Sequence, residues 1–202
     1  MRPRARAQGE GGRFLTEPQA PASDDRDLVL RAQAGDLAAF EELVRRHQQG
    51  LFSYLYRMCR NSSDAEELAQ AAMIRAWEAL AGFRGASSFK TWLYRIGTNL
   101  CLNLRTRRKP AEELPETLAA PDSERPEQAF QQKVREDAVR GALERLPADQ
   151  RAALVLSVYQ DMSYKEIAET MGKTVRAVDS LLFRAKTNVR KALAEDRAKG
   201  VI

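Results

Sequence analysis

Apolar residues recur every three or four positions from Ser23 onward, which is the spacing of amphipathic helices, and no strand alternation accompanies them. One helix is predicted to begin after Asp36, whose carboxylate would cap the free backbone amides. One stripe of this helix is apolar and predicted to be buried: Phe40, Leu43, Val44, Leu51, Leu55 and Met58, with Tyr54 and His47 among them. We interpret His47, the only histidine, as an edge-of-core residue rather than a catalyst.

The next helix is predicted to open at "SDAE", where Ser63 and Glu66 would form a capping box. Its buried stripe would comprise Ala65, Leu68, Ala69, Ala72, Met73, Ala76, Trp77 and Leu80. Ile74 points roughly the opposite way. The other residues of that face are polar, namely Glu67, Gln70 and Glu78. A single exposed isoleucine is ordinary, but among polar neighbours it also suits a docking surface.

A loop containing Gly82 and Gly85 precedes a third helix, which is predicted to continue through Leu104. Residues 84–109 include seven basic residues and no acidic one, and they carry the aromatic residues Phe89, Trp92 and Tyr94. Basic and aromatic side chains together favour single-stranded nucleic acid, since they bind its phosphates and its unstacked bases. The large aromatic side chains fit a helical core equally well. The basic residues that follow the helix suit phosphate contacts: Arg105, Arg107, Arg108 and Lys109.

The composition changes at residues 111–128, which hold six acidic residues, three prolines and a single arginine. This pattern predicts an extended, solvated linker whose negative charge would keep it off DNA. Residues 1–23 are rich in Pro, Gly, Ala and Gln and are expected to be disordered. We therefore predict a tail (1–23), a helical domain (24–110), the acidic linker (111–128), a second helical domain (129–196) and a short tail (197–202).

Signals for a helix-turn-helix stand together in the second domain. Ser163 and Glu166 would form a capping box, Gly172 would end that helix in the left-handed conformation, and Thr174 would cap the next one. A helical hairpin with no role in nucleic-acid binding has the same spacing.

The helix after Thr174 has two contrasting faces. One is apolar: Val175, Val178, Leu182, Ala185 and Val189. The other holds Arg176, Ser180, Phe183, Arg184, Thr187, Arg190 and Lys191. Residues 173–202 contain eight basic and three acidic residues. A basic face with Ser and an exposed Phe suits a DNA major groove, where Arg reads guanine and Phe contacts a thymine methyl.

Composition narrows the choice of function. A net charge of +5 and a pI near 9.4 favour a polyanionic partner. Cys59 and Cys101 fall within helical patterns, which argues for core positions and a reducing compartment rather than a disulfide framework. No secretory signal or membrane-length apolar run is found, so we expect a cytoplasmic protein. Zinc-ligand spacing, a Gly-rich phosphate loop and a nucleophile–base pair are all lacking, so neither an enzyme nor a cofactor is expected.

Several segments in order resemble one family. They are "DAEELAQAAMIRAW", "FRGASSFKTWLYRIGTNLCLN" and, after the linker, "LERLPADQRAALVLSVYQDMSYKEIAETMGKTVRAVDSLLFRAK". Over residues 24–194 the chain resembles a bacterial sigma factor of the extracytoplasmic-function group, in the sigma-70 family. The resemblance implies an all-α fold with two small helical domains joined by a flexible acidic linker, the second containing a helix-turn-helix.

The resemblance also implies partners for each segment. The first domain would bind the clamp helices of the β′ subunit of core RNA polymerase through Glu67, Gln70, Ile74 and Arg75. The β flap, promoter DNA and an anti-sigma factor are further expected partners, without membrane insertion. The acidic linker would run toward the RNA exit path of the polymerase, which supplies the chemistry.

The following segment would melt the minus-ten element and hold its non-template strand. The residues implied are Arg84, Ser87, Lys90, Arg95, Asn99, Asn103, Arg107 and Arg108. Asn99 would line the pocket for a flipped-out base, since an amide offers both a donor and an acceptor. The loop 83–89 would shape specificity.

The second domain would read the minus-thirty-five duplex through Thr174, Arg176, Ser180, Phe183, Arg184 and Thr187. Arg176 would lie near the backbone or the groove edge. Asp179 departs from the family, where a basic or small polar residue is common. A carboxylate there would repel phosphate or accept from a cytosine amino group, so the preference at this element stays open.

Two other functions use similar residues. A conventional helix-turn-helix regulator would use only the second domain on DNA, with residues 24–109 as a sensor or a dimerisation unit. The acid-free segment 84–109 speaks against it, because a sensor does not require one. An RNA-binding or anti-termination protein would also use basic and aromatic residues, but no sheet-based RNA module is apparent.

Overall fold

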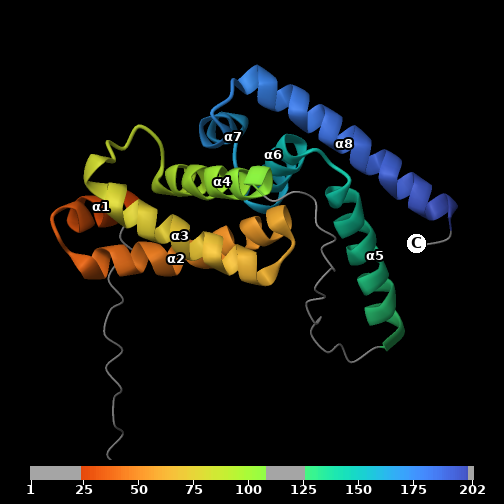
Figure 1. Cartoon of the computed structure of the whole chain (residues 1–202), viewed down its shortest axis with the longest axis horizontal. Helices are drawn as coiled ribbons and strands as arrows, with labels where there is room; N and C mark the ends of the chain where they lie inside the picture. The colour runs from red at the N-terminus through yellow and green to blue at the C-terminus, as the bar shows by residue number, and fades with distance from the viewer. Residues whose placement is uncertain (1–23, 108–125, 200–202) are drawn as a thin grey trace, which may run out of the picture.

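The computed structural model of the chain describes the backbone of residues 24–107 and 126–199, and the side chains of residues 24–104 and 133–199. Within these ranges the fold is all helical, as predicted, and no strand occurs (Figure 1). The elements are α1 (Asp25–Gln33), α2 (Leu37–Cys59), α3 (Ser62–Ala79), the 3-10 turn η1 (Leu80–Gly82), α4 (Phe89–Arg107), α5 (Pro126–Glu144), α6 (Ala148–Tyr159), α7 (Tyr164–Met171) and α8 (Val175–Ala198).

Helices α1–α4 form the first unit, in which α2 packs against α1, α3 and α4. Most of the predicted stripe of α2 is buried, with Leu43, Leu51 and Leu55 fully inaccessible to solvent, while Val44 and His47 are partly buried. Helix α4 comes close to α2 because Gly97 faces Leu51, where a Cβ atom would lie 3.0 Å from Leu51 Cδ1. Beside this point the buried hydroxyls of Tyr54 and Thr98 are 2.8 Å apart, so a hydrogen bond satisfies both.

His47 lies at the edge of this unit, as predicted. Its Nε2 is 2.6 Å from Asp25 Oδ2, and its ring lies 5.5 Å from that of Phe89. The imidazole thus ties α1 to α2 and packs against α4.

The start of α3 corrects one prediction. Asp36 caps α2 as expected, accepting from the backbone amide of Ala39. Helix α3, however, begins at Ser62, and its cap is Asn61, whose side chain accepts from the amide of Asp64 at 2.9 Å. The predicted capping box of Ser63 and Glu66 is therefore wrong. Asn is as good a cap as Ser, and local sequence does not rank two candidates that lie only two residues apart.

Helices α5–α8 form the second unit, and its helix-turn-helix is formed by α7 and α8. The capping box of Ser163 and Glu166 is confirmed, and Gly172 ends α7 with φ +62. Thr174 caps α8 by accepting from the amide of Ala177 at 3.2 Å. Each of these caps joins groups that are no more than four residues apart, so the local sequence is enough to predict all of them.

Four details differ from the expected pattern. Trp77 is 41% exposed although its ring lies 4.8 Å from that of Phe40, and Val175 is 47% exposed because it begins α8. Leu181, which was not assigned to the apolar face of α8, is buried. Helix α5 already begins at Pro126, inside the predicted linker, and proline is favoured at the first position of a helix.

Both cysteines are buried and neither forms a disulfide, which confirms their assignment to the core. They are also neighbours: a hydrogen bond with Cys101, together with burial, raises the pKa of the Cys59 thiol. At neutral pH the Cys59 thiol is therefore protonated and a poor nucleophile.

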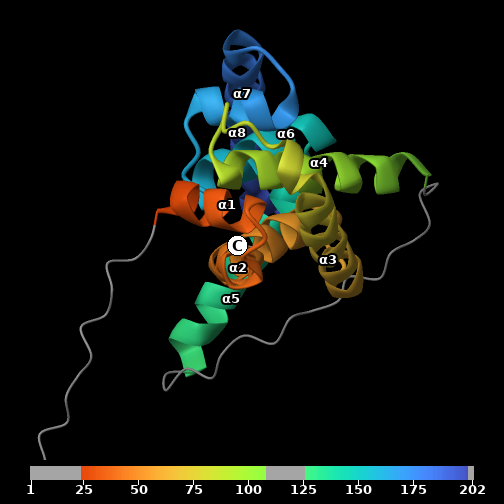
Figure 2. The same ribbon diagram turned by 90° about the vertical axis from the view of Figure 1, so that its left-hand side faces the viewer.

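The two units pack against each other. Helix α4 lies between α1–α3 on one side and α6–α8 on the other, while α5 points away from this body (Figures 1 and 2). Helix α4 contacts α7, and α2 contacts α6. One continuous cluster of buried side chains runs through both units.

Candidate nucleic-acid and polymerase interfaces

The outer face of α3 carries the predicted polymerase-binding residues. Glu67, Gln70 and Ile74 follow one another at spacings of three and four, so they share a face, and Arg75 adjoins it. All four are exposed, Ile74 to 59%. The structure thus presents an apolar side chain inside a charged rim on a rigid helix.

The loop between η1 and α4 rests on an aromatic cluster. Phe83 lies edge-on to Phe89 at 6.5 Å, and its ring is 4.7 Å from that of Trp92. Phe89 is buried and Trp92 is half-buried, so Phe89 belongs to the core and Trp92 reaches the surface. The cluster fixes the base of the loop that carries Arg84 and Ser87.

Two polar residues that the sequence did not single out also position this loop. Gln33 donates from its amide to the carbonyls of Leu80 and Phe83, both at 2.8 Å. The hydroxyl of Ser88 accepts from the amide of Thr91 at 3.0 Å, which caps the start of α4. Gln33 is 47 positions from Leu80, so only the tertiary fold makes its role visible.

The predicted minus-ten residues on α4 fall on two faces. Arg95, Asn99 and Asn103 are spaced by four and are exposed along one side of the helix. Lys90 lies on another side, facing the second unit. Arg107 is the last residue of α4, with its side chain outside the described part, and Arg108 lies outside the described residues. The structure therefore brings together three of these residues, with Arg84 and Ser87 in the adjoining loop, and separates Lys90 from them.

Lys90 is engaged by the other unit. Its ammonium group donates to the backbone carbonyl of Gln160 at 2.7 Å and lies 5.9 Å from the ring of Tyr94. Gln160 is the C-cap of α6, where the helix dipole places partial negative charge that favours a cation. The pKa of Glu166 is lowered, mainly by hydrogen bonds from Ser163, and the charge of Lys90 adds to this effect.

The outer face of α8 is open to solvent. Phe183 is 72% exposed, the highest value among the large apolar side chains described, and Arg176, Ser180, Arg184 and Thr187 are exposed around it. A single exposed ring is not unusual by itself, but here it lies among basic and hydroxyl side chains. The face matches the predicted minus-thirty-five set, with Thr174 as the N-cap at its beginning.

Polar side chains on this face donate hydrogen bonds to backbone carbonyls of α8 itself. Ser180 Oγ donates to the carbonyl of Arg176 at 3.0 Å, and Arg184 Nε donates to that of Ser180 at 3.2 Å. The oxygen of Ser180 can still accept a hydrogen bond from outside the helix. Arg184 keeps its two terminal NH₂ groups as donors, the pair that reads guanine.

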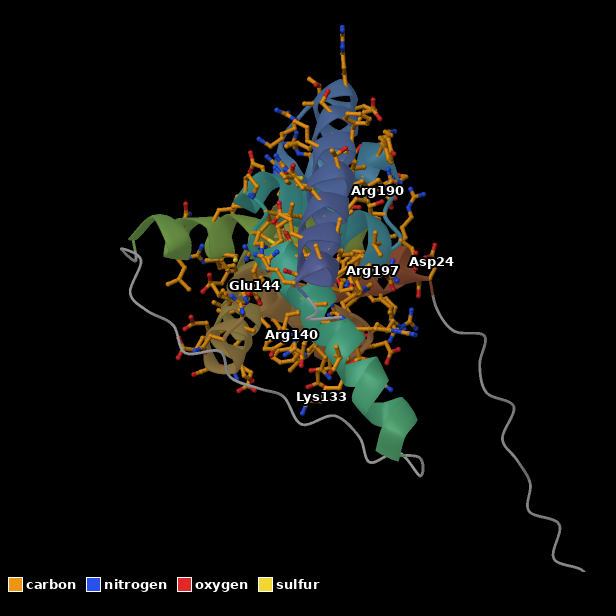
Figure 3. The ribbon with its side chains drawn as sticks, turned by 90° about the vertical axis from the view of Figure 1, so that its right-hand side faces the viewer. Asp24, Lys133, Arg140, Glu144, Arg190 and Arg197 are labelled. Atoms are coloured by element: carbon orange, nitrogen blue, oxygen red, sulfur yellow. The ribbon has the colours of Figure 1, made fainter. Side chains whose placement is uncertain are left out.

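Basic residues continue beyond this face. Figure 3 labels Arg190 and Arg197 along the C-terminal half of α8, and Lys133 and Arg140 along α5. The carboxylate of Asp196 is buried and accepts from Arg145 at 2.8 Å, so it does not reduce the basic character of the exposed surface. Helix α8 therefore carries positive charge beyond this face, whereas the basic residues of α5 are balanced by Glu136, Asp137 and Glu144.

A concave surface of about 740 Å³ lies between α2 and α5. Phe52 and Tyr56, with ring centroids 6.2 Å apart, form one wall, and Val139 and Leu143 form the other. None of the predicted site residues lines it.

In the described residues no group of three or more His, Cys, Asp and Glu side chains is arranged to hold a metal ion. None of the helices in residues 24–107 and 126–199 has the length and apolar character that crossing a membrane requires.

Comparison with known proteins agrees with this geometry. The family model of sigma-70 region 2 matches residues 43–110, which include α3 and α4, and that of sigma-70 region 4 matches residues 136–189, which include the helix-turn-helix. The RNA polymerase sigma-H factor of Pseudomonas aeruginosa is 38% identical over 191 residues, covering 89% of this chain and 96% of that protein. The ECF RNA polymerase sigma-E factor of Escherichia coli (strain K12) is 37% identical over 173 residues, covering 80% and 90%.

A solved structure supports the arrangement of the helices. The structure of CnrH in complex with the cytosolic domain of CnrY superposes with a TM-score of 0.67 at 28% identity, covering 85% of this chain and 98% of CnrH. Two sigma-70 regions in the expected order, relatives matched over nearly their full length and a shared fold lead to one conclusion. The chain belongs to the extracytoplasmic-function group of sigma-70 RNA polymerase sigma factors.

Proposed function

We propose that this protein is the dissociable promoter-specificity subunit of a bacterial RNA polymerase. It docks on core polymerase, positions it by the minus-thirty-five duplex, captures the melted minus-ten strand and leaves after initiation. The observation that carries the proposal is the presence, in one chain, of two basic reading faces, on α4 and on α8, together with the separate exposed face of Ile74 on α3. A duplex-binding regulator needs only one of these three surfaces.

We assign docking on the β′ clamp helices to Glu67, Gln70, Ile74 and Arg75. Burial of a side chain such as Ile74 contributes about 1.5–3 kcal/mol when it moves from water into an apolar site. The charged rim would set the orientation of docking more than its strength. The β flap would contact the second unit.

We assign capture of the minus-ten strand to Arg84, Ser87, Lys90, Arg95, Asn99, Asn103, Arg107 and Arg108. The arginines and the lysine would neutralise phosphates, while Asn99 hydrogen-bonds the edge of a base that has left the stack. The nearby half-buried Trp92 offers a flat surface for stacking, worth roughly 1–3 kcal/mol per base. Its contact with Phe83 and Phe89 would hold the ring in place.

We assign the minus-thirty-five duplex to Thr174, Arg176, Ser180, Phe183, Arg184 and Thr187. Arg184 and Ser180 would hydrogen-bond base edges, and Phe183 would contact a thymine methyl. Arg176, closer to the start of α8, would bind the backbone or the groove edge. Asp179 would favour a cytosine amino group over a phosphate in its reach.

The protein would perform no chemistry of its own, because the polymerase makes the phosphodiester bonds. It would act in the cytoplasm beside that enzyme. An anti-sigma factor would hold it inactive. A protein partner is supported by CnrH, which shares this fold and was solved in complex with the cytosolic domain of CnrY.

Run-off transcription tests the proposal. Purified bacterial core polymerase is incubated with a pool of genomic promoter fragments, with and without the protein. Specific transcripts that depend on the added protein are expected, and alignment of their start sites yields both promoter elements. Specific duplex binding without any such transcripts would overturn the proposal and leave a conventional regulator.

A further inference from the structure

The groove between α2 and α5 belongs to none of the interfaces proposed above. Its volume of about 740 Å³ falls within the range of about 300–1,000 Å³ that is typical of small-molecule sites. None of the residues assigned to core polymerase, to the minus-ten strand or to the minus-thirty-five duplex lines it. The groove is therefore a separate candidate site, whose properties do not depend on the proposed function.

The walls of the groove are apolar and largely aromatic. Phe52 and Tyr56 on α2 have nearly parallel rings, with an angle of 21° between their planes, and both are partly exposed. Val139 on α5 is 37% exposed, and Tyr159, the last residue of α6, is 40% exposed. Covering this apolar surface is favourable, and aromatic rings pack well against another flat ring. The walls therefore favour an occupant with a planar apolar body over a bare ion.

The groove also carries an excess of positive charge. Four arginines and two glutamates line it. The two arginines contributed by α5 are matched by two glutamates of the same helix, and Figure 3 labels Arg140 and Glu144 of this set. The excess therefore comes from Arg57 on α2 and from Arg60, the C-cap of that helix. An anionic occupant is favoured over a neutral or a cationic one.

Arg57 is held in place and keeps donors for a ligand. Its Nη1 donates to the backbone carbonyl and to the hydroxyl of Ser53, both at 3.0 Å, and its Cζ lies 4.2 Å from the centroid of the Tyr159 ring. No carboxylate in the described part of the chain forms an ion pair with Arg57. Its Nε and Nη2 groups remain as a fork of donors, the geometry that binds a carboxylate through two parallel hydrogen bonds.

Arg60 is oriented by Glu144 but is not fully satisfied. Its Nη2 forms an ion pair with the carboxylate of Glu144. Its Nε is the one buried side-chain nitrogen or oxygen atom, among the residues that the structure describes, without a hydrogen-bond partner. A buried donor without an acceptor is unfavourable, and most such groups in folded proteins are paired. An acceptor on a ligand in the groove satisfies this N–H after a small rotation of the guanidinium.

We propose that the groove between α2 and α5 binds a small aromatic carboxylate. Its planar body lies between the rings of Phe52 and Tyr56 on one side and Val139 on the other. Its carboxylate binds Arg57 and Arg60, which are three positions apart and therefore neighbours at the end of α2. A bare anion leaves the apolar walls exposed to water, and a neutral aromatic molecule leaves both arginines without an acceptor.

Isothermal titration calorimetry with 2-naphthoate tests the site on the full-length chain. One molecule is expected to bind per chain, with a dissociation constant of about 10–100 μM. Acetate lacks the planar body and methyl 2-naphthoate lacks the charge, so each is expected to bind at least about tenfold more weakly. Acetate or the ester binding as tightly as 2-naphthoate would overturn the proposal. The absence of binding at millimolar 2-naphthoate would overturn it as well.

Substitutions in the groove locate the binding site. Arg57→Gln removes the charge, and Val139→Glu places a competing carboxylate in the apolar wall, so each is expected to weaken binding of 2-naphthoate at least about tenfold. Arg26→Gln and Val175→Glu are the matched controls, because they change the same residue types at exposed positions outside the groove. Circular dichroism verifies that every variant keeps its helix content. Equal binding by all five proteins would overturn the site.

Methyl NMR gives a second readout at the site itself. In a chain labelled on its Val and Leu methyl groups, 2-naphthoate is expected to shift the resonances of Val139 and Leu143, which line the groove, and not those of Val175. Shifts confined to methyl groups outside the groove would overturn the assignment. Failure of the protein to direct run-off transcription is a separate result, which contradicts the proposed function and leaves the binding results standing.

Discussion

Arg151 is a buried arginine whose removal should destabilise the whole protein. It is 3% exposed on α6, and its guanidinium donates to four backbone carbonyls. Three belong to the end of α5 and the turn after it: Leu143 at 3.0 Å, Glu144 at 2.6 Å and Leu146 at 3.4 Å. The fourth is the carbonyl of Met58 on α2, at 3.0 Å. One side chain thus donates to carbonyls at and just after the end of α5 and ties them to the first unit.

The magnitude follows from these bonds. A hydrogen bond to a charged group contributes about 1.5–3 kcal/mol, and each carbonyl left buried without a donor costs about 1–3 kcal/mol. Removing the buried guanidinium recovers part of this loss, because burying the ion costs several kcal/mol. We expect Arg151→Met to lower the free energy of unfolding by about 3 kcal/mol. For a protein of this size that corresponds to a fall in Tm of about 6–12 °C.

Urea and thermal unfolding followed by circular dichroism measure the effect. Arg190→Met is the matched control, since Arg190 is exposed on α8 and its replacement should change stability by less than about 0.5 kcal/mol. Arg151→Lys should give an intermediate loss, because an ammonium group lacks the planar fork that reaches several carbonyls. If Arg151→Met unfolds at the same urea concentration as Arg190→Met, the guanidinium does not hold the end of α5, and the argument is wrong.

The other predictions concern the proposed interfaces and the thiols. Ile74→Glu should weaken binding to core polymerase at least tenfold in a pull-down titration with unchanged helix content, since the side chain is exposed; lost helicity would instead place it in the core. Asn99→Ala should alter the preference among minus-ten variants in run-off transcription at unchanged core affinity, and an unaltered preference would remove Asn99 from the pocket. Arg184→Ala should reduce discrimination between minus-thirty-five sequences by about 1–3 kcal/mol, roughly 5- to 150-fold in relative binding, and equal discrimination by both proteins would refute the assignment. Because burial and the hydrogen bond with Cys101 raise the pKa of Cys59, iodoacetamide should modify the folded protein far more slowly than the urea-unfolded chain; rapid modification of both thiols in the folded state would contradict this.

The sequence determined the features whose causes lie within a few residues. Helical periodicity fixed the class of the fold and the buried stripe of α2. The caps at Asp36, Ser163 and Thr174 were predicted because each accepts from an amide three residues away. The exposure of Ile74 followed from its angular position on α3. The same local logic failed at Asn61, because Asn61 and Ser63, two residues apart, offered equally good caps.

The sequence predicted which residues belong to the candidate site, but it predicted only part of how they are arranged in space. Spacing by four predicts that Arg95, Asn99 and Asn103 share a face. Spacing does not reveal that Gln33 holds the loop before α4, or that Lys90 faces α6 rather than solvent. Those contacts join residues 47 and 70 positions apart.

Only the tertiary structure decided how the two units meet. A helical repeat tells which side of a helix is apolar, but it does not tell which other helix covers that side. Trp77 and Val175 lie on apolar stripes and are nevertheless partly exposed, because their neighbours do not reach them. Gly50 is a further case that the sequence does not reveal. Its lack of a side chain matters only because Tyr94 and Gln160, which come from different units, meet directly above it in the fold.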